Sequence, residues 1–236
     1  TVQDTAFAAL WDASRQKFLI EERLVSTAPT VDAYASRRTA NSGTSTRNPL
    51  ILGGPQPGAD AEARTVASVY AGSSVLTGSD ATSRRLLEDG PTYSLIHLAT
   101  GTGVNRANPL LSRLVLADEA GQRHSGTVLG TDIAARSMPH TNLVVIDEVE
   151  TPTAHRGEGT LSLARAFLAA GVPAVLGTLP GANEHAIRDL MIGFHREMYS
   201  NVSAEQALQT VQRNAVQQNG RRLGAWSALV LYGSDR

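Results

Sequence analysis

The sequence of 236 residues contains no cysteine. This absence excludes disulfide bonds, catalysis by a thiolate and zinc sites built on cysteine ligands. It does not fix the cellular compartment, but it is compatible with a reducing cytoplasm. We therefore expect a cytoplasmic protein.

Long apolar runs and an excess of one charge sign are also missing. No apolar segment approaches the roughly 20 residues that a membrane-spanning helix needs, and the start TVQDTAFAAL lacks the features of a signal peptide. The 21 Lys and Arg residues nearly balance the 22 Asp and Glu residues, and the basic residues are scattered. A nucleic-acid-binding surface usually shows a clustered basic patch. We expect no membrane association and no nucleic acid partner.

Alternating apolar runs and amphipathic segments predict a folded α/β protein. Strand-like or extended segments are expected at Lys17–Ser26, Pro49–Gly53, Ser74–Leu76, Tyr93–Ala99, Leu110–Leu116, Leu143–Val149, Ala174–Leu179 and Trp226–Tyr232. Helices are expected at Ala59–Ala71, Ala81–Glu88, Gly130–Ala135, Glu158–Ala170, Asn183–Tyr199 and Ala204–Gln218. Strands that are apolar on both faces need helices above and below them. The pattern predicts a three-layer α/β/α sandwich with a mostly parallel sheet.

The N-terminal part departs from this alternation. Lys17–Ser26 mixes apolar with charged residues, which favours an outer strand, paired in a hairpin with the preceding LWDAS. Ser36–Asn48 is polar and without periodicity, which predicts an exposed loop within one domain. We expect residues 1–236 to form a single domain.

One stretch is especially informative. The strand TNLVVIDEVET (Thr141–Thr151) is followed by Gly157-Glu158-Gly159, a helix reading LSLARAFLAAGV and a strand reading PAVLGTLP. This succession resembles the CHAT domain, a bacterial branch of the caspase-like clan CD cysteine endopeptidases, and the resemblance covers nearly the whole chain. Because Ala6–Leu10 resembles a segment inside that domain, we expect the natural protein to have an N-terminal portion before Thr1.

The resemblance also implies that the catalytic dyad is lost. In the family this strand usually ends S-A-C-E-T, and alignment on Glu150-Thr151 places Val149 at the nucleophile position. The family's H-F-A-T-H-G corresponds to a run starting at His97, with Gly101 at the general base. A valine can neither ionise nor attack a carbonyl. The chain is expected to be a pseudopeptidase with no intact catalytic residue, which binds a protein or peptide without cutting it.

Ligands of open α/β sheets bind beyond the carboxyl ends of the strands. The segments Gly101–Asn105, Asp147–Thr153 and Leu179–Glu184 are therefore expected to converge on a cleft. Carboxylates crowded there would raise one another's pKa and attract a cationic side chain of a partner. The candidate cleft residues are His97, Thr102, Asp147, Glu148, Glu150, Asn183 and Glu184.

Structural alternatives stand beside these assignments. His97 corresponds to the first His of the family motif and can be a strand-end residue hydrogen-bonded to its neighbours. Glu150 can accept hydrogen bonds from its loop, while Asp147 or Glu148 pairs with Arg156 or faces solvent. Asn183 and Glu184 stand where the family has acids after a Trp, and they can instead cap the following helix.

Two other functions remain open. One is a hydrolase with replaced chemistry, using the acidic loop with a metal ion or a water molecule, or the Thr102 hydroxyl as nucleophile. The other is a structural half that pairs with an active homologue, as a homodimer or heterodimer. No spacing matches a metal-ligand, dinucleotide, P-loop or serine-hydrolase motif, so we predict no metal site and no cofactor.

Overall fold

The computed structural model describes residues 5–28, 48–105, 107–148, 159–179, 184–218 and 222–234, with the backbone alone at 159, 160 and 184. Its centre is an eight-stranded sheet. Six strands follow the order β10-β9-β8-β5-β3-β4, and the other two are β6, which pairs with β5, and β7, which pairs with β6. The strands are β3 (Leu50–Gly53), β4 (Ser74–Thr77), β5 (Leu95–Gly103), β6 (Arg113–Val115), β7 (Thr127–Leu129), β8 (Leu143–Glu148), β9 (Ala174–Thr178) and β10 (Leu229–Gly233).

The central strands pair in parallel. β3 pairs with β4 and β5, and β8 pairs with β5 and β9, all in parallel, whereas β10 runs antiparallel to β9. Nearly every side chain of β3, β5, β8 and β9 is buried. Strands of this kind require cover on both faces of the sheet.

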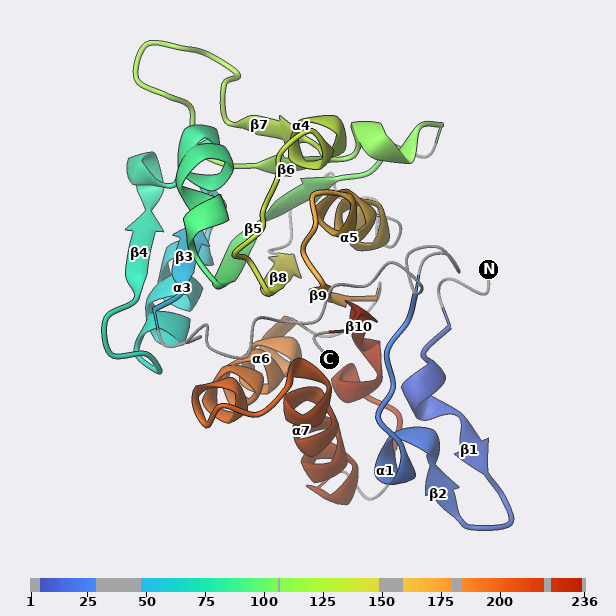
Figure 1. Ribbon diagram of the computed structural model, residues 1–236. Helices are drawn as coiled ribbons and strands as arrows, with labels where there is room; N and C mark the ends of the chain where they lie inside the picture. The colour runs from blue at the N-terminus through green and yellow to red at the C-terminus, as the bar shows by residue number, and fades with distance from the viewer. Residues whose placement is uncertain are drawn as a thin grey trace.

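Helices provide that cover (Figure 1). The helices α4 (Gly130–Ala134) and α5 (Gly159–Ala169) lie on one face, while α3 (Ala59–Ala67), α6 (Glu184–Tyr199) and α7 (Ala204–Gln218) lie on the other. Leu98, Val144 and Phe167 belong to the core on the α5 face, and Leu143, Met191 and Leu208 belong to the core on the α6 and α7 face. The predicted three-layer α/β sandwich with a mostly parallel sheet is confirmed.

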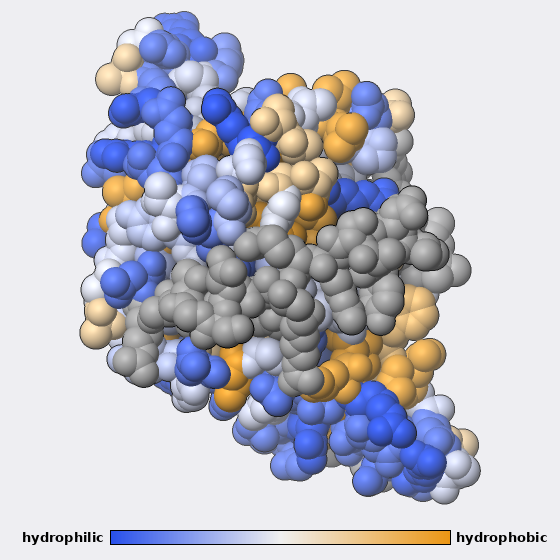
Figure 2. Space-filling view, viewed as in Figure 1, coloured by the Kyte–Doolittle hydropathy of each residue, from blue (hydrophilic) through white to orange (hydrophobic). Residues whose placement is uncertain are grey.

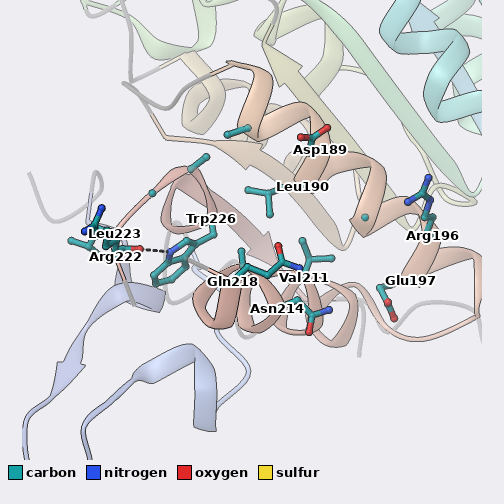
Figure 3. Close-up of a pocket in the computed structure, with 15 residues that line it drawn as sticks. Asp189, Leu190, Arg196, Glu197, Val211, Asn214, Gln218, Arg222, Leu223 and Trp226 are labelled. Carbon is teal, nitrogen blue, oxygen red and sulfur yellow. Dashed lines mark hydrogen bonds between the residues drawn. The ribbon is translucent and has the colours of Figure 1, made fainter. Parts of the chain in front are cut away.

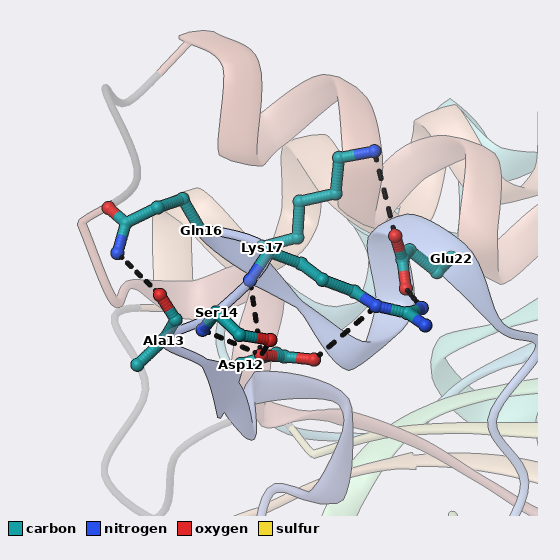
Figure 4. A network of polar contacts seen from close by, with 7 residues as sticks. Asp12, Ala13, Ser14, Gln16, Lys17 and Glu22 are labelled. Atoms are coloured by element: carbon teal, nitrogen blue, oxygen red, sulfur yellow. Dashed lines mark hydrogen bonds and ion pairs between the residues drawn. The ribbon is translucent and has the colours of Figure 1, made fainter.

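The N-terminal segment differs from its prediction. The hairpin exists, but its strands β1 (Trp11–Asp12) and β2 (Lys17–Phe18) are short, and the chain continues as α1 (Leu19–Glu22) instead of an outer strand. At the hairpin turn Asp12 accepts hydrogen bonds from Ser14, and Glu22 forms ion pairs with Arg15 and Lys17 (Figure 4). Phe18 is buried against Trp226, so tertiary packing ends the strand there.

Three further boundaries were wrong. The helix expected at Ala81–Glu88 begins at residue 83, and most of it is a π-helical turn, η4, at Arg85–Asp89. β5 continues to Gly103 because Gly101, Thr102 and Gly103 pair antiparallel with β6. The strand expected at Trp226–Tyr232 begins at Leu229, after the 3-10 helix η7. The 3-10 helices of the described residues are η2 (Phe7–Ala9), η3 (Gly78–Asp80), η5 (Gly90–Thr92), η6 (Pro109–Leu111) and η7 (Ala225–Ala228).

The N-terminal segment also covers one edge of the sheet. Thr27 donates its backbone N–H to Leu231 O over 2.8 Å and accepts the N–H of Gly233 over 2.9 Å, in a parallel bridge to β10. Nearby, hydrophobic residues gather beside hydrophilic ones at the lower right of Figure 2, where Figure 1 places the N-terminal elements. The large exposed hydrophobic residues of that segment are Leu10, Trp11, Leu19 and Leu24.

Helices long and apolar enough to cross a membrane are not found in the described ranges. The loop predicted at Ser36–Asn48 lies almost entirely outside those ranges.

Candidate functional site

The carboxyl ends of β5 and β8 lie side by side. In the parallel register of these strands, Ala99 faces Asp147 and Thr100 faces Glu148. The next residues along the two strands are the two proposed dyad positions. Gly101 is buried within β5, whereas Val149 lies outside the described residues. The structure thus brings together the backbone that precedes both positions.

Thr102 and Glu148 join the two strand ends. The Thr102 hydroxyl donates a hydrogen bond to Glu148 Oε1 over 2.5 Å, and Thr102 is only 4% exposed. Glu148 is half-buried. Because the acceptor is a carboxylate, this hydrogen bond ties the end of β8 to β5.

Asp147 and Glu148 leave β8 on opposite faces of the sheet, because side chains alternate along a strand. Asp147 shares its face with Val145 and lies among side chains of α3, β5 and α6, where it is 4% exposed. The carboxyl group that interacts with Asp147 is that of Glu62 on α3, not that of its chain neighbour. The sequence analysis expected Asp147 to be crowded by other acids of the cleft, whereas the acid that acts on it is Glu62 of a helix.

Burial raises the pKa of Asp147 well above its ordinary value, because a charge in the dry interior is poorly solvated. The charge of Glu62 and a hydrogen bond with Glu62 raise this pKa further, while His97 and Arg188 act in the opposite direction. We infer that Asp147 keeps its proton to a higher pH than an ordinary aspartate. Its Oδ2 atom has no hydrogen-bond partner within the described part of the chain.

A chain of buried polar groups continues from Glu62. His97 Nε2 lies 3.5 Å from Glu62 Oε1, and Arg188 Nε lies 3.8 Å from Glu62 Oε2. His97 Nδ1 lies 3.1 Å from His195 Nε2, and His195 Nδ1 lies 2.8 Å from the Tyr70 hydroxyl. We call Glu62, His97, Asp147, Arg188, His195 and Tyr70 the buried polar cluster.

The two histidines of the cluster are neutral. Burial lowers the pKa of His97 to about 4, against a smaller opposing effect of Asp147, and burial together with His97 lowers the pKa of His195. Burial raises the pKa of Tyr70, which keeps its proton. A consistent assignment has Tyr70 donating to His195, His195 donating to His97, and the His97 Nε2–H directed towards Glu62.

This arrangement agrees with the structural alternative for His97, which is fully buried and bonded to a neighbouring histidine. The sequence reasoning missed Glu62, Arg188 and His195. Helical spacing contained the signal for two of them. Glu62 lies among Ala59, Ala63 and Val66, and His195 lies among Met191, Phe194 and Met198, at the three- and four-residue spacing of a buried face.

The remaining candidates are less informative. Glu150 and Asn183 lie outside the described residues, and Glu184 is described only as the first residue of α6. Among the residues that the structure describes, no group of three or more His, Cys, Asp or Glu side chains is arranged to hold a metal ion. No metal-binding residues are assigned.

A groove of about 720 Å³ lies elsewhere, between α6 and α7 (Figure 3). Asp189, Leu190, Arg196 and Glu197 line it from α6, and Val211, Asn214 and Gln218 line it from α7. Arg222, Leu223 and Trp226 close one end. The groove is formed by the helices, whereas His195 of the same α6 contacts His97 of the sheet and Arg188 contacts Glu62 of α3.

Comparison with known families supports the architecture. The sequence model of the family described as CHAT domain matches residues 1–234, essentially the whole chain. No curated protein matches the sequence.

Proposed function

The chain belongs to the CHAT domain family, and from this premise we propose that it is a caspase-like pseudopeptidase, which binds a protein or peptide partner without cutting it. One observation carries the proposal. The resemblance to the family places Val149 at the position of its nucleophilic cysteine and Gly101 at that of its general base. Neither residue can transfer a proton or form a covalent adduct with a peptide.

The geometry of the strand ends supports the same function. Thr100 and Glu148, which precede the two altered positions, face each other in the register of β5 and β8. This register supports the proposal, because the strand ends that precede the two positions lie side by side in the described residues. The Thr102 hydroxyl is buried and bound to Glu148, so it is a structural link and not an accessible nucleophile.

The partner proposed for this edge is a peptide segment with a cationic side chain. Glu148 is half-buried and points away from the buried polar cluster, at the end of a strand. A carboxylate in such a place favours Lys or Arg over an acidic residue. We place the protein in the bacterial cytoplasm, acting alone or as a dimer.

A cleavage assay tests the absence of catalysis. Purified protein is incubated with a library of unstructured peptides, and we expect no cleavage above buffer. The double variant Gly101→His with Val149→Cys restores both side chains on the same scaffold and serves as the positive comparison. Cleavage by the wild-type chain would contradict the proposal. If this cleavage disappeared in a Glu148→Gln variant but survived in a Thr102→Val variant, it would show replaced chemistry that depends on the acid.

A binding assay on the same library tests partner recognition. We expect peptides with Lys or Arg to be retained by the wild-type protein and to bind about tenfold more weakly to Glu148→Gln, the equivalent of one charged hydrogen bond of about 1.4 kcal/mol. Asp189→Asn removes an exposed carboxylate from α6 and should leave binding unchanged. Equal loss in both variants, or no retained peptide, would count against a binding edge at β8.

A further inference from the structure

The groove between α6 and α7 combines an apolar floor with a charged rim (Figure 3). Of the residues that line it, Val211, Ala215 and Trp226 are buried and Leu190 is half-buried. Leu223 closes one end and is 67% exposed, more than any other large hydrophobic residue of the described chain. A groove of this size beside so exposed a leucine is typical of a surface that another protein covers.

The rim of the groove carries an acid and a base in a regular order on α6. Asp189 and Arg196 are seven residues apart, which is about two helical turns, so they lie on the same side of the helix about 10 Å apart along its axis. Both side chains are exposed, and both line the groove. Neither forms an ion pair within the part of the chain that the structure describes. Their charges are therefore available to a partner.

A second acid and a second base extend this order over the length of the groove. Glu197 is the neighbour of Arg196, whereas Arg222 lies at the end that Leu223 closes. Along α6, Asp189 lies closer than Arg196 to that end (Figure 3). The signs along the groove, starting from Arg222, are therefore positive, negative, and then a positive and a negative side chain together.

This charge order is complementary to a rotated copy of itself. A two-fold axis through the midpoint between Asp189 and Arg196 makes the two α6 helices antiparallel and brings Asp189 of one copy opposite Arg196 of the other, twice by symmetry. The same rotation exchanges the ends of the groove, so Arg222 of one copy approaches Glu197 of the other. Parallel α6 helices would instead bring Asp189 opposite Asp189. Like charges in that position oppose association.

We propose that the groove between α6 and α7 is the interface of a symmetric homodimer, in which a second copy of this chain covers the apolar floor and Leu223. The charged rim sets the antiparallel orientation. The dimer does not depend on the proposed function. Glu148 leaves β8 on the face of the sheet that α5 covers, together with Val144 and Ile146, whereas α6 and α7 cover the other face.

Sedimentation equilibrium of the full chain tests the dimer. We expect the wild type to form a dimer with a dissociation constant in the micromolar range or below, and this constant should rise with salt because exposed ion pairs are screened. Asp189→Arg and Arg196→Asp each place like charges at both symmetric contacts. Each variant should raise the dissociation constant about tenfold. Circular dichroism shows whether each variant is folded.

Mixing the two variants gives the sharpest result. Asp189→Arg has two positive side chains at these positions and Arg196→Asp has two negative ones, so an equimolar mixture should form a heterodimer about as stable as the wild-type homodimer. The double variant, which exchanges both charges within one chain, should also regain the homodimer. A local defect of folding in one variant would not be repaired by mixing.

Two further variants complete the test. Arg213→Asp makes the same change of charge as Arg196→Asp at an exposed position of α7 outside the groove, and it should leave the dissociation constant unchanged. Leu223→Ser should weaken the dimer to the same extent at low and at high salt, because an apolar contact is not screened. A chain that stays monomeric, a dimer that the charge reversals do not weaken, or a mixture without a heterodimer would overturn the proposal.

Discussion

At the scale of single residues, burial decides which groups of the buried polar cluster carry charge. Asp147 and His97 are an acid and a base that interact electrostatically, and a solvated pair of this kind would be ionised. Here desolvation dominates for both groups, since it raises the pKa of the acid and lowers that of the base. The interior under the strand ends is therefore polar with little charge.

Because the buried histidines are neutral, the free energy of unfolding depends on pH. The folded-state pKa of His97 is about 4, below the ordinary 6.5, so only the unfolded chain binds a proton between these values. Stability is full above pH 6.5 and falls as the pH decreases towards 4, by about 3 kcal/mol from His97 alone. His97→Asn should be less stable than wild type at pH 7.5 but should lose less stability between pH 7.5 and pH 5, as measured by urea unfolding.

The control for this prediction is His140→Asn, which changes an exposed histidine. It should keep the pH dependence of the wild type. His97→Asn could instead lose as much stability between pH 7.5 and pH 5 as the wild type. The pKa of His97 would then have to be ordinary, and the assignment of neutral histidines that accept from Tyr70 and from each other would be wrong.

At this scale, the sequence could predict contacts between residues that are close in the chain but not between residues that are far apart in it. The alternation of β8 follows from its sequence, so the opposite orientation of Asp147 and Glu148 was available from the start. The contact of Asp147 with Glu62 was not, because it joins a strand to a helix from a distant part of the chain. Helical spacing placed Glu62 on a buried face, but it could not identify the group that Glu62 meets.

At the scale of elements, α6 connects two different environments. One side of the helix contributes Arg188 and His195 to the buried polar cluster, and another side lines the groove shared with α7. Gly193 lines the groove, and because glycine has no side chain there is room beside Val211. The packing of α6 therefore affects both regions.

Two glycine substitutions should act with opposite signs. A Cβ atom at Gly193 would lie 3.4 Å from a methyl group of Val211, an ordinary contact, and alanine favours a helix over glycine. We expect Gly193→Ala to stabilise the protein by about 0.5–1 kcal/mol. A Cβ atom at Gly53 would lie 3.0 Å from Ala59 O and from Ala63 Cβ, so Gly53→Ala should destabilise it by about 1–3 kcal/mol. Urea unfolding of the two variants decides, and equal signs would contradict the packing of α3 on β3.

The sequence predicted the elements where a pattern is repeated over many residues. The strands β3, β8 and β9 and the helices α5, α6 and α7 were expected close to their observed bounds. β5 was predicted too short because Gly101 and Gly103 suggest a loop, and only the partner strand β6 keeps them extended. The π-helical turn at Arg85–Asp89 left no distinct periodicity in the sequence.

At the scale of the whole molecule, the N-terminal segment holds the β10 edge of the sheet. An uncovered strand edge offers free N–H and C=O groups to other chains. Thr27 occupies two of these groups through its hydrogen bonds with Leu231 and Gly233. Residues near the two ends of the described chain are thereby joined in one sheet.

Thr27→Pro should weaken this edge, because proline has no N–H to donate to Leu231 O. We expect a loss of stability of about 1 kcal/mol, the usual contribution of one hydrogen bond, and more self-association in analytical ultracentrifugation. Thr27→Ala keeps the backbone donor and is the matched control. A proline variant as stable and as monodisperse as the alanine variant would show that the bridge is unimportant.

The opposite orientation of Asp147 and Glu148 also guards the folding of the sheet. If β8 were displaced by a single residue against its neighbours, every one of its side chains would change sides. The longer side chain of Glu148 would then enter the buried space next to Glu62, and Asp147 would be turned to the opposite face of the sheet. The two carboxyl groups of β8 therefore favour the observed register over its nearest alternative.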